Sequence, residues 1–199
     1  MTTIVAFVRE YPFATLVTSG SQGLLAAHIP VVVRQDAAGD IPTLFGHLAR
    51  ANPQWQEFDG ATEALVIFQG AHGYVSPSLY EVHPSVPTWN YQVVHAYGVP
   101  RLIDDVSETR DHVLELVRQN EAQSSEPWQP DLPEEVLEGL LRQIVAFRIE
   151  LVRVEAKFKL GQNRSRTDRE NVAGALEDSG DSLLRALGRA TRTSLDQGQ

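Results

Sequence analysis

The alternation of hydrophobic and polar positions divides the chain into a strand-rich first half and a second half that contains most of the helices. Up to residue 103 the pattern predicts short strands separated by turns, with a helix over 3–10, a loop over 36–40 and one or two helical turns over 51–58. The predicted strands cover residues 13–18, 24–34, 43–48, 64–69, 74–76 and 93–103. This spacing is typical of an antiparallel barrel or sandwich and not of βαβ units.

The second half changes from period two to helical spacing. Val113, Leu114, Leu116 and Val117 form an apolar stripe that predicts a helix over 107–120, with Ser107 as its N-cap. Further helices are predicted over 133–142, 169–176 and 182–190, a strand over 144–154, and a frayed tail over 191–199. We therefore expect one α+β domain over residues 1–190, a mostly antiparallel β-barrel with flanking helices and C-terminal helices.

Composition places the chain among globular proteins. It has 199 residues, of which 42% are apolar and 22% charged, and it has no cysteine. The lack of cysteine excludes disulfides, thiolate catalysis and iron–sulfur clusters. The longest apolar runs have strand length, far short of a membrane span, and the first residues lack the pattern of a signal peptide. A cytoplasmic location is the expectation.

The net charge of −9 is unevenly distributed along the chain. Residues 148–169 hold seven basic and three acidic side chains, so this stretch carries +4 and the remainder −13. Both lysines of the protein, Lys157 and Lys159, fall within this stretch. An acidic majority argues against non-specific coating of nucleic acid, since phosphate binding needs clustered cations. We predict no strong binding of duplex DNA.

Motifs for metal binding or covalent catalysis are missing from the sequence. None of the six histidines forms a His-Glu-x-x-His pair, and there is no Gly-x-Ser-x-Gly, no phosphate loop and no Gly-x-Gly-x-x-Gly after a strand. No metal site and no catalytic residue is therefore assigned. Non-covalent ligand binding is the favoured theme.

Three stretches combine polar groups with aromatic rings or cations. Residues 46–55 follow a strand and enter a helical turn, so His47, Arg50 and Asn52 predict an anion site, with a plain surface turn as the alternative. Residues 76–80 and 87–91 offer hydroxyls, an amide and flat rings, which suit either a planar heteroaromatic ligand or a protein interface. Residues 157–164 carry three cations and two amides, and the alternative there is a helix N-terminus with solvated cations.

Seven blocks in this order carry a resemblance to a known family. They are Pro-Phe-Ala-Thr-Leu-Val-Thr (12–18), Gly-His-Leu-Ala-Arg-Ala-Asn-Pro-Gln-Trp (46–55), Ala-Leu-Val-Ile-Phe-Gln-Gly (64–70), Ser-Pro-Ser-x-Tyr (76–80), Pro-Thr-Trp-Asn-Tyr (87–91), Val-His-Ala-Tyr-Gly (94–98) and Lys-Leu-x-Gln-Asn-Arg (159–164). Together they resemble the PaiB-like family of FMN-binding negative transcriptional regulators. The resemblance implies a split β-barrel like that of pyridoxamine-phosphate oxidase, a homodimer, and FMN bound near the subunit interface. One departure is Leu79, which stands where the family has tryptophan.

The chemistry of FMN assigns roles to the candidate residues once the resemblance is given. Its phosphate needs cations and polar donors, its ring needs a flat apolar slot with donors facing the carbonyls, and a third group would close the pocket from the same or the other subunit. For the phosphate these are Arg50, His47 and Asn52; for the ring Thr15, His28, Ser76, Trp89 and Asn90; for closure Lys159, Gln162, Asn163 and Arg164.

The function implied is that of a flavin-binding regulatory protein with a DNA or protein partner. The alternative is a flavin-dependent oxidoreductase acting on a small molecule, as in the pyridoxamine-phosphate oxidases, and this rests on analogy of fold. A third interpretation is a flavin-storing or heme-handling protein. The acidic residues 177–181 between the last two predicted helices argue against a helix-turn-helix that faces phosphates.

Overall fold

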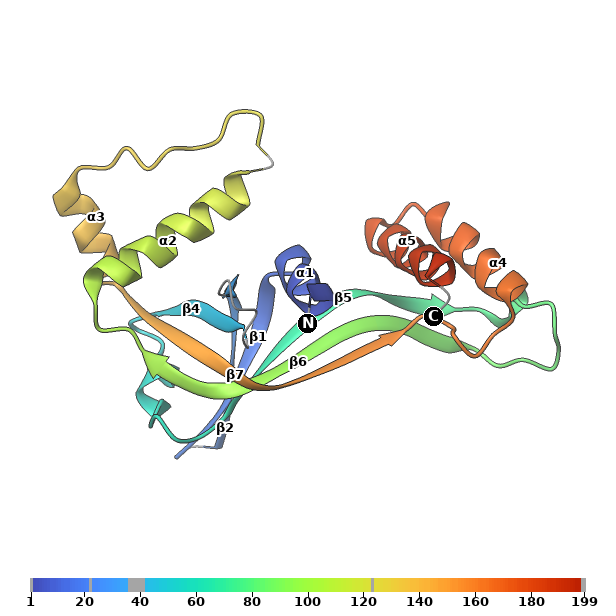
Figure 1. Ribbon diagram of the computed structural model, residues 1–199, viewed down its shortest axis with the longest axis horizontal. Helices are drawn as coiled ribbons and strands as arrows, with labels where there is room; N and C mark the ends of the chain where they lie inside the picture. The colour runs from blue at the N-terminus through green and yellow to red at the C-terminus, as the bar shows by residue number, and fades with distance from the viewer. Residues whose placement is uncertain (1, 22, 36–41, 123, 198–199) are drawn as a thin grey trace. The chain divides into compact units, whose positions relative to one another are not determined.

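The computed structural model describes residues 2–21, 23–35, 42–122 and 124–197 (Figure 1). The predicted α+β class is confirmed, and the loop predicted over 36–40 lies outside the described residues. The elements are α1 (Thr2–Glu10), β1 (Phe13–Gly20), β2 (Gly23–Pro30), β3 (Val32–Arg34), β4 (Thr43–Ala49), the 3-10 turn η1 (Pro53–Glu57), β5 (Ala64–Val75), η2 (Pro77–Leu79), β6 (Thr88–Leu102), α2 (Val106–Glu121), α3 (Glu134–Leu141), β7 (Ile144–Lys159), α4 (Arg166–Glu177) and α5 (Ser182–Asp196).

The strands form one sheet in the order β2-β1-β5-β6-β7-β4-β3. β1 pairs antiparallel with β2 and β5, and β4 pairs antiparallel with β3 and β7. The β1–β2 hairpin pairs from Phe13 opposite Pro30 to Gly20 opposite Gly23. Gly23 has a φ of 95°, a left-handed conformation that glycine adopts without strain at such a turn.

The contacts divide the chain into two compact units. Unit 1 comprises the residues up to Phe68 together with His95–Glu155, and unit 2 comprises Gln69–Val94 together with Ala156–Gln199. β5, β6 and β7 each contribute one part to unit 1 and another to unit 2. A single domain over residues 1–190 stays a prediction.

Unit 1 packs alternate residues of its strands into a core. Leu16, Leu44, Phe147 and Ile149 are fully buried. Their neighbours on β1 are more exposed, as the period of two requires, whereas the run 145–147 of β7 is buried throughout. At Gly98 on β6, an added Cβ would lie 2.3 Å from the backbone carbonyl oxygen of Glu150 on β7. Glycine is required there because the two strands approach closely.

Unit 2 covers one face of its strands with α4 and α5 (Figure 1). The core between them contains Ala71, Val75, Tyr80, Leu160, Val172, Leu176 and Leu187. On β5 the buried positions of unit 1 are Val66 and Phe68, whereas those of unit 2 are Ala71 and Val75. The buried side of β5 therefore changes at Gln69 and Gly70, which lie between these two parts.

Several boundaries differ from the sequence prediction. Residues 64–69 and 74–75 belong to one continuous strand, β5, in which the missing side chain of Gly73 leaves room for Leu184. β6 begins five residues earlier than predicted, at Thr88, and β7 continues to Lys159. The N-cap of α2 is Asp105, two residues before the expected Ser107.

The predicted frayed tail is a further difference. α5 extends to Asp196, and Thr191, Ser194 and Leu195 are buried. The Ser194 hydroxyl accepts a hydrogen bond from Nη2 of Arg169 on α4 at 2.9 Å. The expectation of a tail is wrong for residues 191–196, since the polar Thr-Arg-Thr-Ser run concealed a helical face that packs on α4.

Candidate functional site

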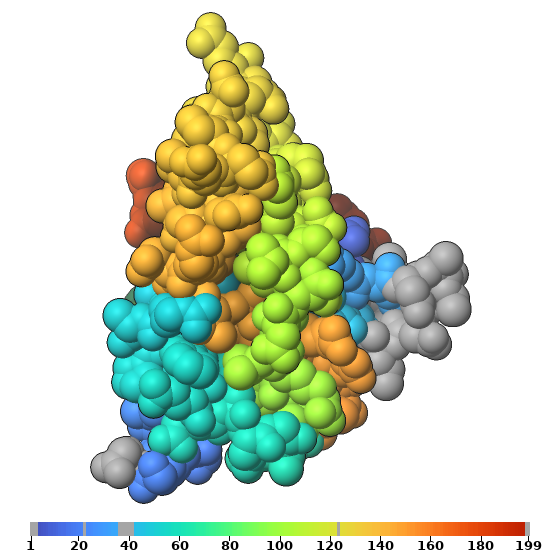
Figure 2. All heavy atoms as spheres, turned by 90° about the vertical axis from the view of Figure 1, so that its left-hand side faces the viewer, coloured from blue at the N-terminus to red at the C-terminus, as the bar shows by residue number. Residues whose placement is uncertain are grey.

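A pocket with a volume of about 460 Å³ lies in unit 1. It opens on the face shown in Figure 2, where α3, the start of α2 and the segment around η1 come together. Its wall is mainly apolar, with two arginines and two acids at the edge. The lining residues are Arg50, Trp55, Leu102, Ile103, Asp104, Val106, Thr109, Glu138, Leu141, Arg142, Ile144, Val145 and Ala146.

Arg50 is the only one of the three predicted anion ligands among the described residues that line this pocket. Its Nε donates to the carbonyl oxygen of Arg142 at 2.7 Å, and its Nη2 donates to the carbonyl oxygen of Ile144 at 2.9 Å. The guanidinium also lies 6.0 Å from the centre of the Trp55 ring. These contacts hold the cation in place at the wall of the pocket. The next acids along the chain are Glu57 and Asp59. Their carboxylates accept hydrogen bonds from residues 21, 61 and 62.

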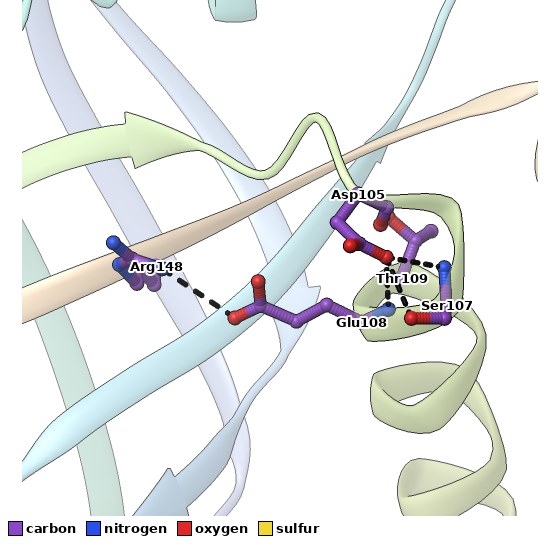
Figure 3. Close-up of polar contacts among 5 residues, drawn as sticks. All are labelled: Asp105, Ser107, Glu108, Thr109 and Arg148. Carbon is purple, nitrogen blue, oxygen red and sulfur yellow. Dashed lines mark hydrogen bonds and ion pairs between the residues drawn. The ribbon is translucent and has the colours of Figure 1, made fainter.

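The first turn of α2 forms another part of the wall. Asp105 caps the helix by accepting from the backbone N–H of Ser107 and Glu108 and from the Ser107 hydroxyl (Figure 3). These donors favour the ionised carboxylate and lower the pKa of Asp105. Glu108 reaches Arg148 on β7 at 3.5 Å, so the start of α2 is tied to the sheet beside the pocket.

His47 is engaged in a buried histidine pair instead of the pocket. Its Nδ1 lies 3.2 Å from Nε2 of His112, whose side chain on α2 is fully buried. Burial lowers the pKa of His47 and, with the neighbouring His47 and Arg34, lowers the pKa of His112 to about 4. Both rings are therefore neutral at pH 7, one nitrogen donating and the other accepting.

Asn52 has a local structural role. Its Oδ1 accepts from the backbone N–H of Gln54 at 3.0 Å and caps η1. The buried Gln54 amide in turn donates to the Thr18 hydroxyl at 3.0 Å. Residues 46–55, which the sequence predicted as an anion site, are thus held to the sheet by several polar contacts. Of its three predicted ligands, Arg50 is the one that lines the pocket.

Thr15 and His28 lie opposite each other on β1 and β2 of unit 1. Both belong to the face of the hairpin that is turned away from the buried Ala14 and Leu16. His28 is stacked against the exposed Phe13, with ring centres 6.1 Å apart. This face offers a threonine hydroxyl and an imidazole on an otherwise apolar, accessible surface.

Unit 2 contains seven of the predicted residues. Trp89 is 56% exposed and lies beside His72 and Tyr74, with ring centres 6.5 Å apart in each pair. The Lys159 ammonium donates to the Thr88 hydroxyl and to the Trp89 carbonyl oxygen. Ser76 caps η2, accepting from the backbone N–H of Ser78 at 3.2 Å.

The turn between β7 and α4 holds the remaining candidates. Gln162 closes the turn on itself, accepting from the Leu160 N–H and donating to the Phe158 carbonyl oxygen. Asn163 is exposed. Arg164 lies 4.1 Å from the centre of the Tyr80 ring and donates to the Ser85 hydroxyl at 3.2 Å.

Asn90 is the buried member of this group. Its side chain is 2% exposed, and its Oδ1 has no hydrogen-bond partner within the described ranges. It lies next to Gly161, whose φ of 80° and lack of a side chain shape the turn. The residues predicted in unit 2 therefore lie close to one another. Lys159 contacts Trp89 on one side of the strands, and Asn90 is buried on the other side.

Sequence reasoning missed the residues that complete these neighbourhoods. In unit 1 they are Arg142, Trp55 and His112, and in unit 2 they are His72, Tyr74 and Tyr80. Trp55 carried a signal, since it ends the same block as Arg50. No local sequence signal indicated His112, because its partner His47 lies 65 positions away. Within residues 2–197 as described, no three metal-ligating side chains gather and no helix is long and apolar enough to cross a membrane.

Comparison with known proteins shows the family to which the chain belongs. The family model described as "Putative FMN-binding domain" matches residues 1–153, which is more than half of the chain. The chain therefore belongs to this family of FMN-binding domains. The described residues form a seven-stranded sheet with five helices, which is the α+β split-barrel fold that the sequence predicted.

Individual relatives agree with this family. The chain is 35% identical over 172 residues to the Bacillus subtilis protein "Protease synthase and sporulation protein PAI 2", covering 86% of this chain and 82% of that one. Two solved structures share the fold. They are the flavocytochrome Anf3 from Azotobacter vinelandii (TM-score 0.61, 13% identity, 81% and 68% of the two chains) and the FAD and heme binding protein from Mycobacterium smegmatis (TM-score 0.60, 14% identity, 80% and 71%).

Proposed function

We propose that this protein binds FMN in the pocket of unit 1 and acts as a flavin-binding regulatory protein. The observation that carries the proposal is Arg50, a guanidinium fixed by two backbone carbonyls at the wall of a pocket of about 460 Å³. The family match and the similarity to PAI 2 support the same ligand class. The volume falls within the range usual for small-molecule and cofactor sites.

The chemistry of the wall fits a phosphate with a planar group attached. A preorganised guanidinium forms charge-assisted hydrogen bonds with phosphate oxygens, and Arg142 supplies a second cation on the same wall. The apolar residues of β6, β7 and α3 and the Trp55 ring offer surface for the isoalloxazine. When bound, FMN would supply one- or two-electron redox chemistry, while the protein would supply orientation and charge.

The test compares FMN with riboflavin, which lacks the phosphate. Arg50→Ala removes one charge-assisted contact, worth about 1.5–3 kcal/mol, and should weaken FMN binding roughly ten- to hundredfold. Riboflavin affinity should change much less. Arg101→Ala is the matched control, since Arg101 is an exposed arginine of the same unit outside the pocket lining. Unchanged FMN affinity in Arg50→Ala would move the phosphate to Lys159 or Arg164.

The other predicted ligands remain predictions of the same proposal. Thr15 and His28 are accessible on the hairpin face of unit 1, whereas His47 and Asn52 would have to leave their present partners to reach a ligand. We expect His47→Ala and Asn52→Ala to lower the stability of the fold more than they lower FMN affinity. The cytoplasmic location expected from the sequence also stays a prediction.

We further propose a homodimer. Trp89 is 56% exposed and therefore does not fill the interior of unit 2, and Phe13 and Leu24 are exposed on the β1–β2 hairpin of unit 1. Exposed aromatic and aliphatic anchors of this size are typical of interface centres. Sedimentation equilibrium should give a species of twice the 22.0 kDa chain mass. A monomer at all micromolar concentrations would contradict the dimer.

A further inference from the structure

The charged side chains that line the pocket of unit 1 balance one another. They are two arginines, Arg50 and Arg142, and two acids, Asp104 and Glu138, so the wall is neutral as a whole. A phosphate monoester such as that of FMN carries a charge of about −1.5 to −2 at pH 7. Its binding therefore depends on how far the acids compensate the two arginines before the ligand arrives.

Arg50 leaves part of a phosphate without donors. A guanidinium has five N–H donors, and two of those of Arg50 are used by the carbonyl oxygens of Arg142 and Ile144. The phosphate presents three strongly accepting oxygens, each with room for more than one hydrogen bond. A second cation is needed to pair them fully. Among the described residues of the lining, Arg142 is the only other one.

Arg142 is already paired with one of the two acids. Its Nη1 lies 3.5 Å from Oε2 of Glu138, one turn earlier at the end of α3. The two side chains are 68% and 51% exposed, so the pair lies where solvent reaches the pocket. A single contact of this length between exposed groups is weak and is readily exchanged. Asp104, in contrast, makes no ion pair with a residue that the structure describes.

We propose that the Glu138–Arg142 pair is an electrostatic gate for the phosphate: Glu138 holds Arg142 until FMN binds, and the phosphate then takes the place of the carboxylate. This inference rests on the proposed FMN site. A phosphate has more charge and more acceptor oxygens than the carboxylate and can displace it, whereas riboflavin has no group that could. The gate thus makes the site selective for the phosphorylated flavin.

The first experiment removes the competing carboxylate. The affinities of the full chain for FMN and for riboflavin are measured by flavin fluorescence at low ionic strength. Glu138→Gln should strengthen FMN binding about two- to fivefold, because Arg142 no longer has a competing partner, and should leave riboflavin binding unchanged. Glu135→Gln is the matched control. It removes the same charge from α3 outside the pocket lining and should change FMN affinity much less.

The second experiment removes the cation. Arg142→Gln should weaken FMN binding at least about fivefold and leave riboflavin binding unchanged. The substitution keeps the backbone carbonyl to which Arg50 donates, and it changes an exposed side chain, so the fold should be retained. In the double variant Glu138→Gln/Arg142→Gln, most of the gain from Glu138→Gln should disappear, because that gain acts through Arg142.

Two results would overturn the gate: an equal gain in Glu138→Gln and Glu135→Gln, or a gain from Glu138→Gln that persists in full without Arg142. Each would reduce the effect to general charge repulsion. If Arg50→Ala weakens FMN binding and Arg142→Gln does not, the gate is wrong and the FMN site stands. If neither variant weakens it, the FMN site itself is wrong, and the gate with it.

Discussion

Units 1 and 2 use different parts of β5, β6 and β7 to build surfaces of different shape. Unit 1 has a concave, largely apolar pocket in which one cation is fixed by backbone carbonyls. Unit 2 covers one side of its strands with a helical pair and leaves rings and lysines exposed on the other. A concave site encloses a small ligand, whereas exposed rings are typical of protein interfaces.

The two units also differ in how their polar side chains are paired and in how closely their elements pack. Unit 1 brings β6 and β7 into contact at Gly98 and buries a neutral histidine pair beneath α2. The helical pair of unit 2 has open space at Gly174 and is joined across its surface by the Arg192–Glu177 ion pair. Unit 1 should therefore respond strongly to added volume at Gly98 and to protonation of the histidine pair, whereas the helical pair of unit 2 should respond only weakly to added volume at Gly174.

The largest expected effect is that of Gly98→Ala in unit 1. The new Cβ would lie 2.3 Å from the Glu150 carbonyl oxygen and 2.6 Å from the Ile149 side chain, and a strand backbone cannot retreat without losing its pairing. We expect the free energy of unfolding to fall by about 3 kcal/mol in a urea titration. A change below about 1 kcal/mol would mean that the two strands are less tightly apposed than described.

Acid sensitivity of the histidine pair should be nearly as large. The pKa of His112 is lowered to about 4 in the folded protein, against an ordinary value of 6.5. The unfolded state binds the proton more readily, so the stabilisation is present above pH 6.5 and is lost as the pH falls toward 4. The loss is on the order of 3 kcal/mol.

Urea titrations at pH 7.0, 5.5 and 4.5 measure this effect. In His112→Gln the difference between pH 7.0 and 4.5 should shrink, whereas in the matched control His28→Gln, an exposed histidine of the same unit, it should persist. Identical pH profiles for wild type and His112→Gln would show that other groups cause the acid loss.

The ion pair on the helical pair of unit 2 should matter much less. Arg192 donates two hydrogen bonds to one Glu177 oxygen and one to the other, but its side chain is 43% exposed. Arg192→Ala should lower the free energy of unfolding only slightly at low salt, and still less at high salt, because exposed pairs are screened. A loss of several kcal/mol that does not depend on salt would indicate a packing role.

Gly174→Ala should give the smallest effect, and with the opposite sign. An added Cβ meets nothing within 4 Å at this position of α4, and alanine favours the helix by about 0.5–1 kcal/mol. Thermal unfolding should therefore shift slightly upward. Destabilisation comparable to that of Gly98→Ala would remove the contrast between the two units.

Local signals allowed much of the fold to be predicted. The helix over 3–10, the strands around residues 13–18 and 43–48, and the turn after Asn52 all appear where hydrophobic spacing and turn residues placed them. The glycines of β5 concealed one long strand, because their small size reflects the packing of α5 and not a break. The end of α5 was hidden by polar residues whose buried partners lie on α4.

The site was less predictable, since its contacts join distant parts of the chain. Arg50 could be proposed from its block, but its anchoring carbonyls lie 92 and 94 residues further on. His47 was assigned to phosphate because nothing local indicates a partner on α2. Trp89 and Lys159 were both identified, yet their contact depends on β6 and β7 being neighbours in the sheet.

The most direct test of FMN binding is the visible absorption spectrum of the protein after incubation with excess FMN and gel filtration. Flavin bands should elute with the wild-type protein in stoichiometric amount and should be strongly reduced in Arg50→Ala. Bands that NADPH bleaches would favour the oxidoreductase function, and bands that it leaves unchanged would favour the regulatory one. A wild-type protein that elutes without flavin bands, although folded by circular dichroism, would contradict the account.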